Sequence, residues 1–152
     1  MNHKTIKVKV GDQEGDIDEK IAPLIKLIWQ SGIYTLNCCE NNVPEDWVWI
    51  EFMSVDDAEL FLNLVARYSD DMDNSMYHRI RNVWDAQESM QWKYQVHLDD
   101  LGVDFSIDDN DDSYKETFSG EHTFNFTMSV RFPQSDLPEV FKNLKESFQN
   151  LN

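Results

Sequence analysis

Two adjacent cysteines, Cys38 and Cys39 in the stretch "TLNCCENN", are the residues with the most distinctive chemistry. A cysteine attacks a substrate or exchanges electrons as its thiolate, which a nearby base or positive charge favours. Strand alternation puts Cys38 on the side of Leu36 and Cys39 on the side of Asn37, so we expect Cys38 in the core and Cys39 on an open face. Nothing in the sequence places His97 beside Cys39. Cys39 therefore has two interpretations: a reactive thiol partnered by His97, or a small packed residue at a strand end.

The cysteines and histidines do not have the spacing of a metal site. Structural zinc sites use four Cys or His ligands at spacings such as C-x₂-C, which adjacent cysteines do not reproduce. The four histidines form no H-x₃-H or H-E-x-x-H pattern, and no glycine-rich phosphate motif occurs among the five glycines. The sequence predicts no metal site and no cofactor.

An acidic run, "DDNDD", begins like a calcium-binding loop. Asp108, Asn110 and Asp112 occupy alternate positions, as the first ligands of an EF-hand do. The pattern then fails, because Ser113 stands where the tight turn needs glycine and Ser119 stands where a bidentate glutamate is needed. We expect a solvated hairpin loop over residues 99–112.

Trp47 and Trp49 stand two residues apart in "DWVWIEF". Both point to one side if this segment is a strand. On an open sheet face they would stack on a ligand ring or form the centre of an interface with another protein. The alternative is that a later helix or the loop at 99–112 covers them, and the sequence leaves both possibilities open.

Apolar periodicity predicts the elements that position these residues. Alternation of apolar and polar residues predicts strands at 5–10, 33–39, 47–52, 91–98 and 123–132. Helical spacing of apolar residues predicts helices at 18–33, 54–68, 75–86 and 135–148. Ser54 and Asp57 have the arrangement of a helix-capping pair, Pro23 fits a first helical turn, and Asp136 and Glu139 fit the start of the last helix.

The order β-α-β-β-α-(α)-β-β-α predicts an α+β fold, in which a mainly antiparallel sheet carries helices on one face and the first part has a ferredoxin-like order. Length predicts a single domain over residues 1–152. The face without helices should present the polar members of each strand, a surface with mixed charge and a tryptophan. These residues are Lys7, Lys9, Thr35, Asn37, Cys39, Trp49, Glu51, Lys93, Gln95, His97, Asn125, Thr127, Ser129 and Arg131.

The charge balance limits the classes of partner. With 13 Lys and Arg against 29 Asp and Glu, the formal net charge is −16, which repels phosphate backbones and anionic membranes. We expect no direct binding to nucleic acid and no membrane association. No apolar run approaches the ~20 residues of a membrane span, and free adjacent cysteines fit a reducing compartment, so we expect a soluble cytoplasmic protein.

Two segments resemble a set of small bacterial proteins of unassigned function. The segment "IAPLIKLIWQSGIYTLNCCE" is similar to their helix I-A-P-L-x-x-x-L-W followed by G-I-x-T-x-x-S-C-[QE], and "FTMSVRFPQSDLPEVFKNL" is similar to their F-x-V-x-V-R-F-P strand and final helix. The resemblance covers about a third of the chain and aligns Cys39 with the cysteine of that pattern, while Cys38 replaces its serine. It implies the fold and no activity.

Three hypotheses about function follow. The first is a non-enzymatic, acidic binding module that uses the open sheet face for a protein partner or for self-association. The candidate residues of that face are Asn37, Cys39, Trp49, Glu51, His97 and Arg131. The alternatives are a small-molecule-binding or thiol-dependent enzyme around Cys39 and His97, and an acidic inhibitor that imitates nucleic acid.

Overall fold

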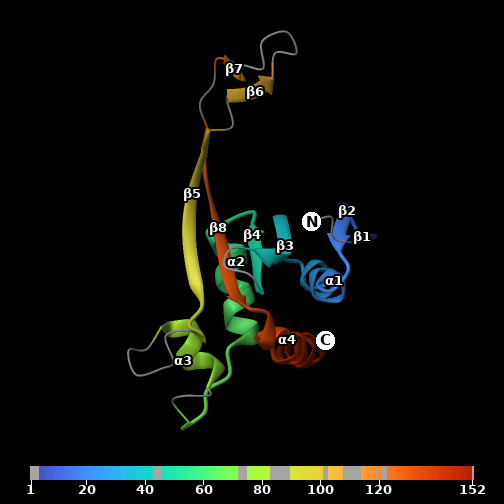
Figure 1. Cartoon of the computed structure of the whole chain (residues 1–152), viewed down its shortest axis with the longest axis vertical. Coiled ribbons are helices and arrows are strands. Elements are labelled where there is room, and N and C mark those ends of the chain that lie inside the picture. Colours follow the sequence, from blue (N-terminus) through green and yellow to red (C-terminus); the bar gives the residue numbers. More distant parts are fainter. Residues whose placement is uncertain are drawn as a thin grey trace.

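A four-stranded antiparallel sheet with helices against one face forms the centre of the computed structural model (Figure 1). The structure describes residues 4–42, 46–71, 75–82, 90–100, 103–107, 114–118, 120 and 123–151. The strands are β1 (Thr5–Val10), β2 (Gln13–Asp18), β3 (Thr35–Asn42), β4 (Trp47–Phe52), β5 (Lys93–Asp100), β6 (Val103–Ile107), β7 (Tyr114–Phe118) and β8 (Phe124–Pro133). The helices are α1 (Ala22–Gln30), α2 (Val55–Val65), α3 (Met76–Arg81) and α4 (Leu137–Leu151), with a short 3₁₀ turn, η2 (Gln134–Asp136), before α4. The α+β fold class and the predicted order of elements are confirmed.

The main sheet has the order β3-β4-β8-β5, and every neighbouring pair is antiparallel. Along β4 the residues alternate between fully buried and partly exposed, with Val48, Ile50 and Phe52 on the buried side. These side chains and the core residues of β8 pack in one cluster with apolar residues of α1, α2 and α4. The helices therefore cover one face of the sheet and leave the other face to the polar members of the strands.

The first strand lies outside the main sheet, which corrects one expectation. β1 pairs only with β2, through a turn at Gly11, whose φ of 59° is a conformation that glycine adopts freely. Lys7 and Lys9 are therefore not on the open face of the main sheet. Thr35 is not on that face either, because a register shift in β3 places it opposite the buried Phe52, on the helix side. β2 was not predicted, because its sequence, "QEGDID", is polar and has low strand propensity.

The β1–β2 hairpin closes one edge of the main sheet, next to β3. At one end of β3 the Gln13 amide donates to Ile33 O (3.0 Å) and accepts from Thr35 N (3.2 Å). At the other end Glu40 N donates to Asp18 (3.0 Å), and Glu40 in turn accepts from a backbone N–H of the loop after β2 (2.8 Å). The side chains of Gln13 and Asp18 therefore form hydrogen bonds with backbone groups at the two ends of β3, and these groups cannot pair with a further strand.

The helix starts follow the predicted local chemistry. The Ser54 hydroxyl accepts from Asp57 N (3.1 Å) and donates to the Asp57 carboxylate (2.7 Å), which caps α2. Pro23 lies in the first turn of α1, where its missing N–H leaves no hydrogen bond unmade. Both features agree with the prediction from sequence.

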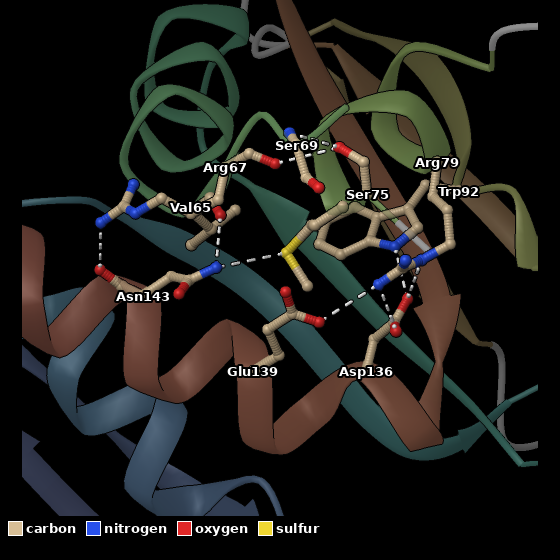
Figure 2. Close-up of polar contacts among 10 residues, drawn as sticks. Val65, Arg67, Ser69, Ser75, Arg79, Trp92, Asp136, Glu139 and Asn143 are labelled. Carbon is tan, nitrogen blue, oxygen red and sulfur yellow. Dashed lines mark hydrogen bonds and ion pairs between the residues drawn. The ribbon is translucent and has the colours of Figure 1, made fainter. Parts of the chain in front are cut away.

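A buried ion pair joins α3 to the start of α4 (Figure 2). Arg79 donates to Asp136 through Nη2 (2.9 Å) and Nε (3.4 Å), and both side chains are more than nine-tenths buried. The Trp92 indole N–H donates to the same carboxylate (2.9 Å), and the Trp92 ring stacks on Phe132 of β8 at 4.6 Å. Asp136 thus accepts hydrogen bonds from two residues that are far away in sequence. It links the segment just before β5 to the segment just after β8.

A second set of polar contacts joins the end of α2 to α4 (Figure 2). Asn143 donates from Nδ2 to Val65 O (3.0 Å), and its own backbone carbonyl accepts from Arg67 Nη2 (3.1 Å). Arg67 also donates to the Ser147 hydroxyl (2.7 Å). These hydrogen bonds hold the C-terminal end of α2 beside α4.

The strands β5 and β8 run on beyond the helices as a two-stranded ribbon, with the β6–β7 hairpin at its far end (Figure 1). Four apolar residues on the helix side of this ribbon remain between 56% and 61% exposed: Val96, Leu98, Phe124 and Phe126. The loop predicted at 99–112 contains strand β6, and the positions of the calcium-like pattern at 108–113 lie outside the described residues.

We expect Asp136→Asn to lower the free energy of unfolding by about 3 kcal/mol, because the substitution leaves the Arg79 charge buried without a counter-ion. Urea unfolding followed by circular dichroism measures the loss. Glu139→Gln is the matched control, since Glu139 contacts the same guanidinium at 3.3 Å but is 46% exposed, and it should cost less than about 1 kcal/mol. Equal losses in the two variants would contradict this role for Asp136.

Candidate functional site

The structure places all the predicted candidate residues on one face of the main sheet. Opposite residues in an antiparallel pair share a face, so the register defines rows across the sheet. One row runs Cys39, Trp49, Arg131, Lys93, and the next runs Asn37, Glu51, Ser129, Gln95. His97 follows in the third row, opposite Thr127. We call this surface the open face.

The floor of the open face consists of small hydroxyl residues on the central strand β8. Thr127 and Ser129 are 0% and 2% exposed, because longer side chains on β4 and β5 extend over them. Thr127 donates to Glu51 Oε2 at 2.7 Å, and the Ser129 hydroxyl lies 3.0 Å from His97 Nε2. Glu51 and His97 are thereby held in place by the floor.

Arg131 lies at the centre of the face with two tryptophans and a lysine around it. It faces Trp49 on one side and Lys93 on the other. The Lys93 ammonium sits over the Trp47 ring, 5.1 Å from its centroid. A hollow of about 200 Å³ opens beside Arg131, lined by Lys93, Tyr94, Gln95, Ser129 and Arg131.

One polar atom of this site has no hydrogen bond. Arg131 Nε is buried and finds no acceptor in the part of the chain that the structure describes. A buried donor without a partner costs roughly 1–3 kcal/mol, so such atoms are uncommon in folded proteins. Only an acceptor that hydrogen-bonds to Nε itself would remove that cost.

The open face is cationic at its centre although the whole chain is acidic. Its first row carries Arg131 and Lys93, while Glu51 in the second row already accepts a hydrogen bond from Thr127. Trp47 and Trp49 lie on the same side of β4, as the sequence predicted for a strand, and both remain partly exposed, which the sequence had left open. The arrangement can hold an anionic group on Arg131 and an apolar or aromatic group on the tryptophans.

Cys39 and His97 are not brought together. Cys39 is on β3 and His97 is on β5, with β4 and β8 between them, a separation of about 14 Å at the usual strand spacing. The described residues therefore contain no thiol and imidazole pair of this kind.

Cys38 and Cys39 face opposite sides of β3, as strand alternation predicted. Cys39 is opposite Trp49 on the open face, whereas Cys38 packs against the core. Burial, with smaller contributions from the nearby Asp18 and Cys39, raises the pKa of the Cys38 thiol from 9.0 to about 12. Cys38 is therefore a neutral thiol at physiological pH.

A further hollow, of about 410 Å³, lies between β2 and β3 and was missed from sequence because β2 was not predicted. Three carboxylates line it, Asp12, Glu14 and Asp16, together with the apolar side chains of Leu36 and Met53. Within the described residues, no group of three or more His, Cys, Asp or Glu side chains is arranged to hold a metal ion.

The helices in the described ranges are all too short or too polar to cross a membrane.

Comparison with known proteins finds a viral protein of similar sequence, whose printed description assigns no activity. The chain is 30% identical over 139 residues to "Uncharacterized protein R428" of Acanthamoeba polyphaga mimivirus. The match covers 90% of this chain and 65% of the viral protein, so the chain spans about two-thirds of the length of that relative. No family model matches the chain, and no solved structure matches it.

We expect Cys38 to resist alkylation in the folded protein. With a pKa of about 12, roughly one thiol in 10⁴ is ionised at pH 8, against about one in ten for a thiol with the ordinary pKa of 9.0. In the Cys39→Ser variant, where Cys38 is the sole cysteine, iodoacetamide labelling at pH 8 should be at least 100-fold slower in buffer than in 8 M urea. Comparable rates in the two solvents would show that Cys38 is not protected.

Proposed function

We propose that the chain is a non-enzymatic binding module that takes a protein partner on the open face. The observation that carries the proposal is Arg131, which lies between Trp49 and Lys93 with a hollow beside it and a buried Nε that has no acceptor among the described residues. In a chain with a net charge of −16, few side chains would attract an anion. On the open face two cationic side chains, Arg131 and Lys93, share one surface with Trp47 and Trp49.

The chemistry of the face indicates the kind of segment that it would bind. A guanidinium donates two parallel hydrogen bonds to a carboxylate, and charge-assisted bonds of this type are among the stronger ones in proteins. Tryptophan contributes a large apolar area at little cost in conformational entropy, which is why tryptophan and arginine are enriched among the residues that dominate binding energy. The preferred partner is therefore a segment with a carboxylate flanked by aromatic or apolar side chains.

The total charge limits that partner further. Because the formal net charge is −16, a highly acidic partner would be repelled at long range even if one of its carboxylates reached Arg131. A partner with a single carboxylate among apolar side chains avoids this repulsion and still satisfies the Arg131 guanidinium.

The contacts of Glu51, His97 and Cys39 favour binding over catalysis. Glu51 and His97 are each engaged by a hydroxyl of the floor, and two strands, β4 and β8, separate Cys39 from His97. Acid–base or nucleophilic catalysis needs such groups within hydrogen-bonding reach of one another or of one reacting atom. The spread of these groups across the sheet suits recognition of an extended segment.

A short blocked peptide tests the proposal: a central glutamate flanked by phenylalanines, with a serine at each end. Isothermal titration should show binding to the protein that weakens at least tenfold in Arg131→Ala, because the variant loses a charge-assisted pair of hydrogen bonds. Trp49→Ala should weaken binding to a similar degree through lost apolar contact.

The controls separate the site from general charge and aromaticity. Arg81→Ala removes an exposed arginine at the end of α3, and Tyr68→Ala removes an aromatic side chain that is 66% exposed; neither should alter the affinity. A peptide with glutamine in place of glutamate should bind at least tenfold more weakly. Equal binding of the two peptides, or unchanged affinity in Arg131→Ala, would overturn the proposal.

A further inference from the structure

The two edges of the main sheet differ in whether another strand could pair with them. The β3 edge is irregular, with register shifts on both sides of the Asn37–Cys39 pairing, and the β1–β2 hairpin occupies its backbone groups at both ends. The β5 edge has a continuous register of eight residues against β8. Among the described residues none pairs with the outer side of β5, and Figure 1 shows no labelled element beside it there.

An unpaired edge of this length is a template for another strand, and natural proteins usually shield such an edge with bulges, prolines or a covering segment. β5 has no bulge and no proline, and the covered edge is β3. The outer edge of β5 is therefore the place where the sheet of this protein can be extended.

The sequence of β5 indicates which strand would extend it. In an antiparallel pairing of two β5 strands, residues that share a face must stand opposite each other, so a two-fold axis passes through a single residue position. With the axis at Val96, Lys93 of one copy stands opposite Asp99 of the other, and this ion pair occurs twice. Gln95 then stands opposite His97, and no like charges meet.

The apolar side of the strand supports the same register. With Val96 on the axis, the two valines face each other and Leu98 stands opposite Tyr94 of the second copy. Val96 and Leu98 are 56% and 58% exposed in the single chain, which is unusual for aliphatic side chains on the helix side of a sheet.

The second copy also brings its helix layer to the exposed ribbon. Tyr94 donates from its hydroxyl to Ile80 O of α3 (2.6 Å), so α3 lies under the beginning of β5. When Tyr94 of one copy stands beside Leu98 of the other, that copy's α3 approaches the helix side of the ribbon near Leu98. Phe126 of β8 stands opposite Leu98 and is one strand further in.

We infer that two copies of this chain associate through antiparallel pairing of β5, with Val96 on the two-fold axis and Lys93 opposite Asp99. The two four-stranded sheets then form one eight-stranded sheet, and the two open faces lie on the same side of it. The association goes beyond the proposed binding function and does not depend on Arg131. Its ion pair requires the Lys93 ammonium to turn from the Trp47 ring towards the outer edge of β5.

Cysteine cross-linking tests both the association and its register. In a Cys38→Ser, Cys39→Ser background, Val96→Cys should form a disulfide-linked dimer under mild oxidation, because residues that face each other have Cβ atoms ~5 Å apart. Leu98→Cys is the matched control: its exposure is nearly the same, but the two copies of residue 98 would be about 13 Å apart along the strands. Cross-linking of Leu98→Cys as fast as Val96→Cys would overturn this register.

A charge exchange tests the same pairing without oxidation. Sedimentation equilibrium of the unmodified chain at 0.15 M salt and 100 μM should give twice the 17.9 kDa of one chain. Lys93→Asp and Asp99→Lys should each weaken the dimer about tenfold or more, and the double variant should restore it to within about threefold. Lys26→Asp on α1 is the matched control for charge and should leave the dimer unchanged. A monomer at 100 μM, or no recovery in the double variant when circular dichroism shows a folded chain, would overturn the inference.

Discussion

The buried pair of Arg79 and Asp136 is the constraint on which the position of β5 depends. Asp136 accepts from Arg79 on α3 and from Trp92 just before β5, while it directly precedes α4. These contacts hold the start of β5 beside the end of β8, and the stacking of Trp92 on Phe132 continues that contact into the core. A buried ion pair is often no more stabilising than apolar residues of similar size, but an unpaired buried charge is costly, so arrangements that bury one of these charges without the other are disfavoured.

The open face follows from this arrangement of strands. Because β5 lies against β8, Lys93 comes opposite Arg131 and His97 comes beside Ser129. Small hydroxyl residues on the central strand allow the longer side chains of β4 and β5 to meet above them, and they engage Glu51 and His97 in hydrogen bonds. In the part of the chain that the structure describes, Arg131 has no such partner for its Nε, so a cationic group at the centre of the face keeps an unused donor.

Sequence patterns predicted the local features and the composition of the open face well. Alternation placed Cys39, Trp49, Glu51, His97 and Arg131 on one side of their strands, and the register confirms this because it depends only on a period of two residues. The capping pair at Ser54 could also be predicted, since it involves residues only three positions apart.

The order of the strands within the sheet could not be predicted from the sequence, and this order separates Cys39 from His97. The contact of Arg79 with Asp136 joins residues 57 positions apart, and β2 is too polar to be recognised as a strand, so neither feature has a local signal.

The central claim is that the open face is the binding surface, and the indole N–H resonances of the tryptophans test it directly. In ¹H–¹⁵N spectra recorded during titration with the glutamate peptide, the Trp47 and Trp49 indole signals should shift, because both rings lie beside Arg131 and Lys93. The Trp92 and Trp29 signals should stay in place, since their N–H groups already donate to Asp136 and to Thr35 inside the fold. Shifts confined to Trp29 or Trp92, or no shift of Trp49 at saturating peptide, would contradict the account.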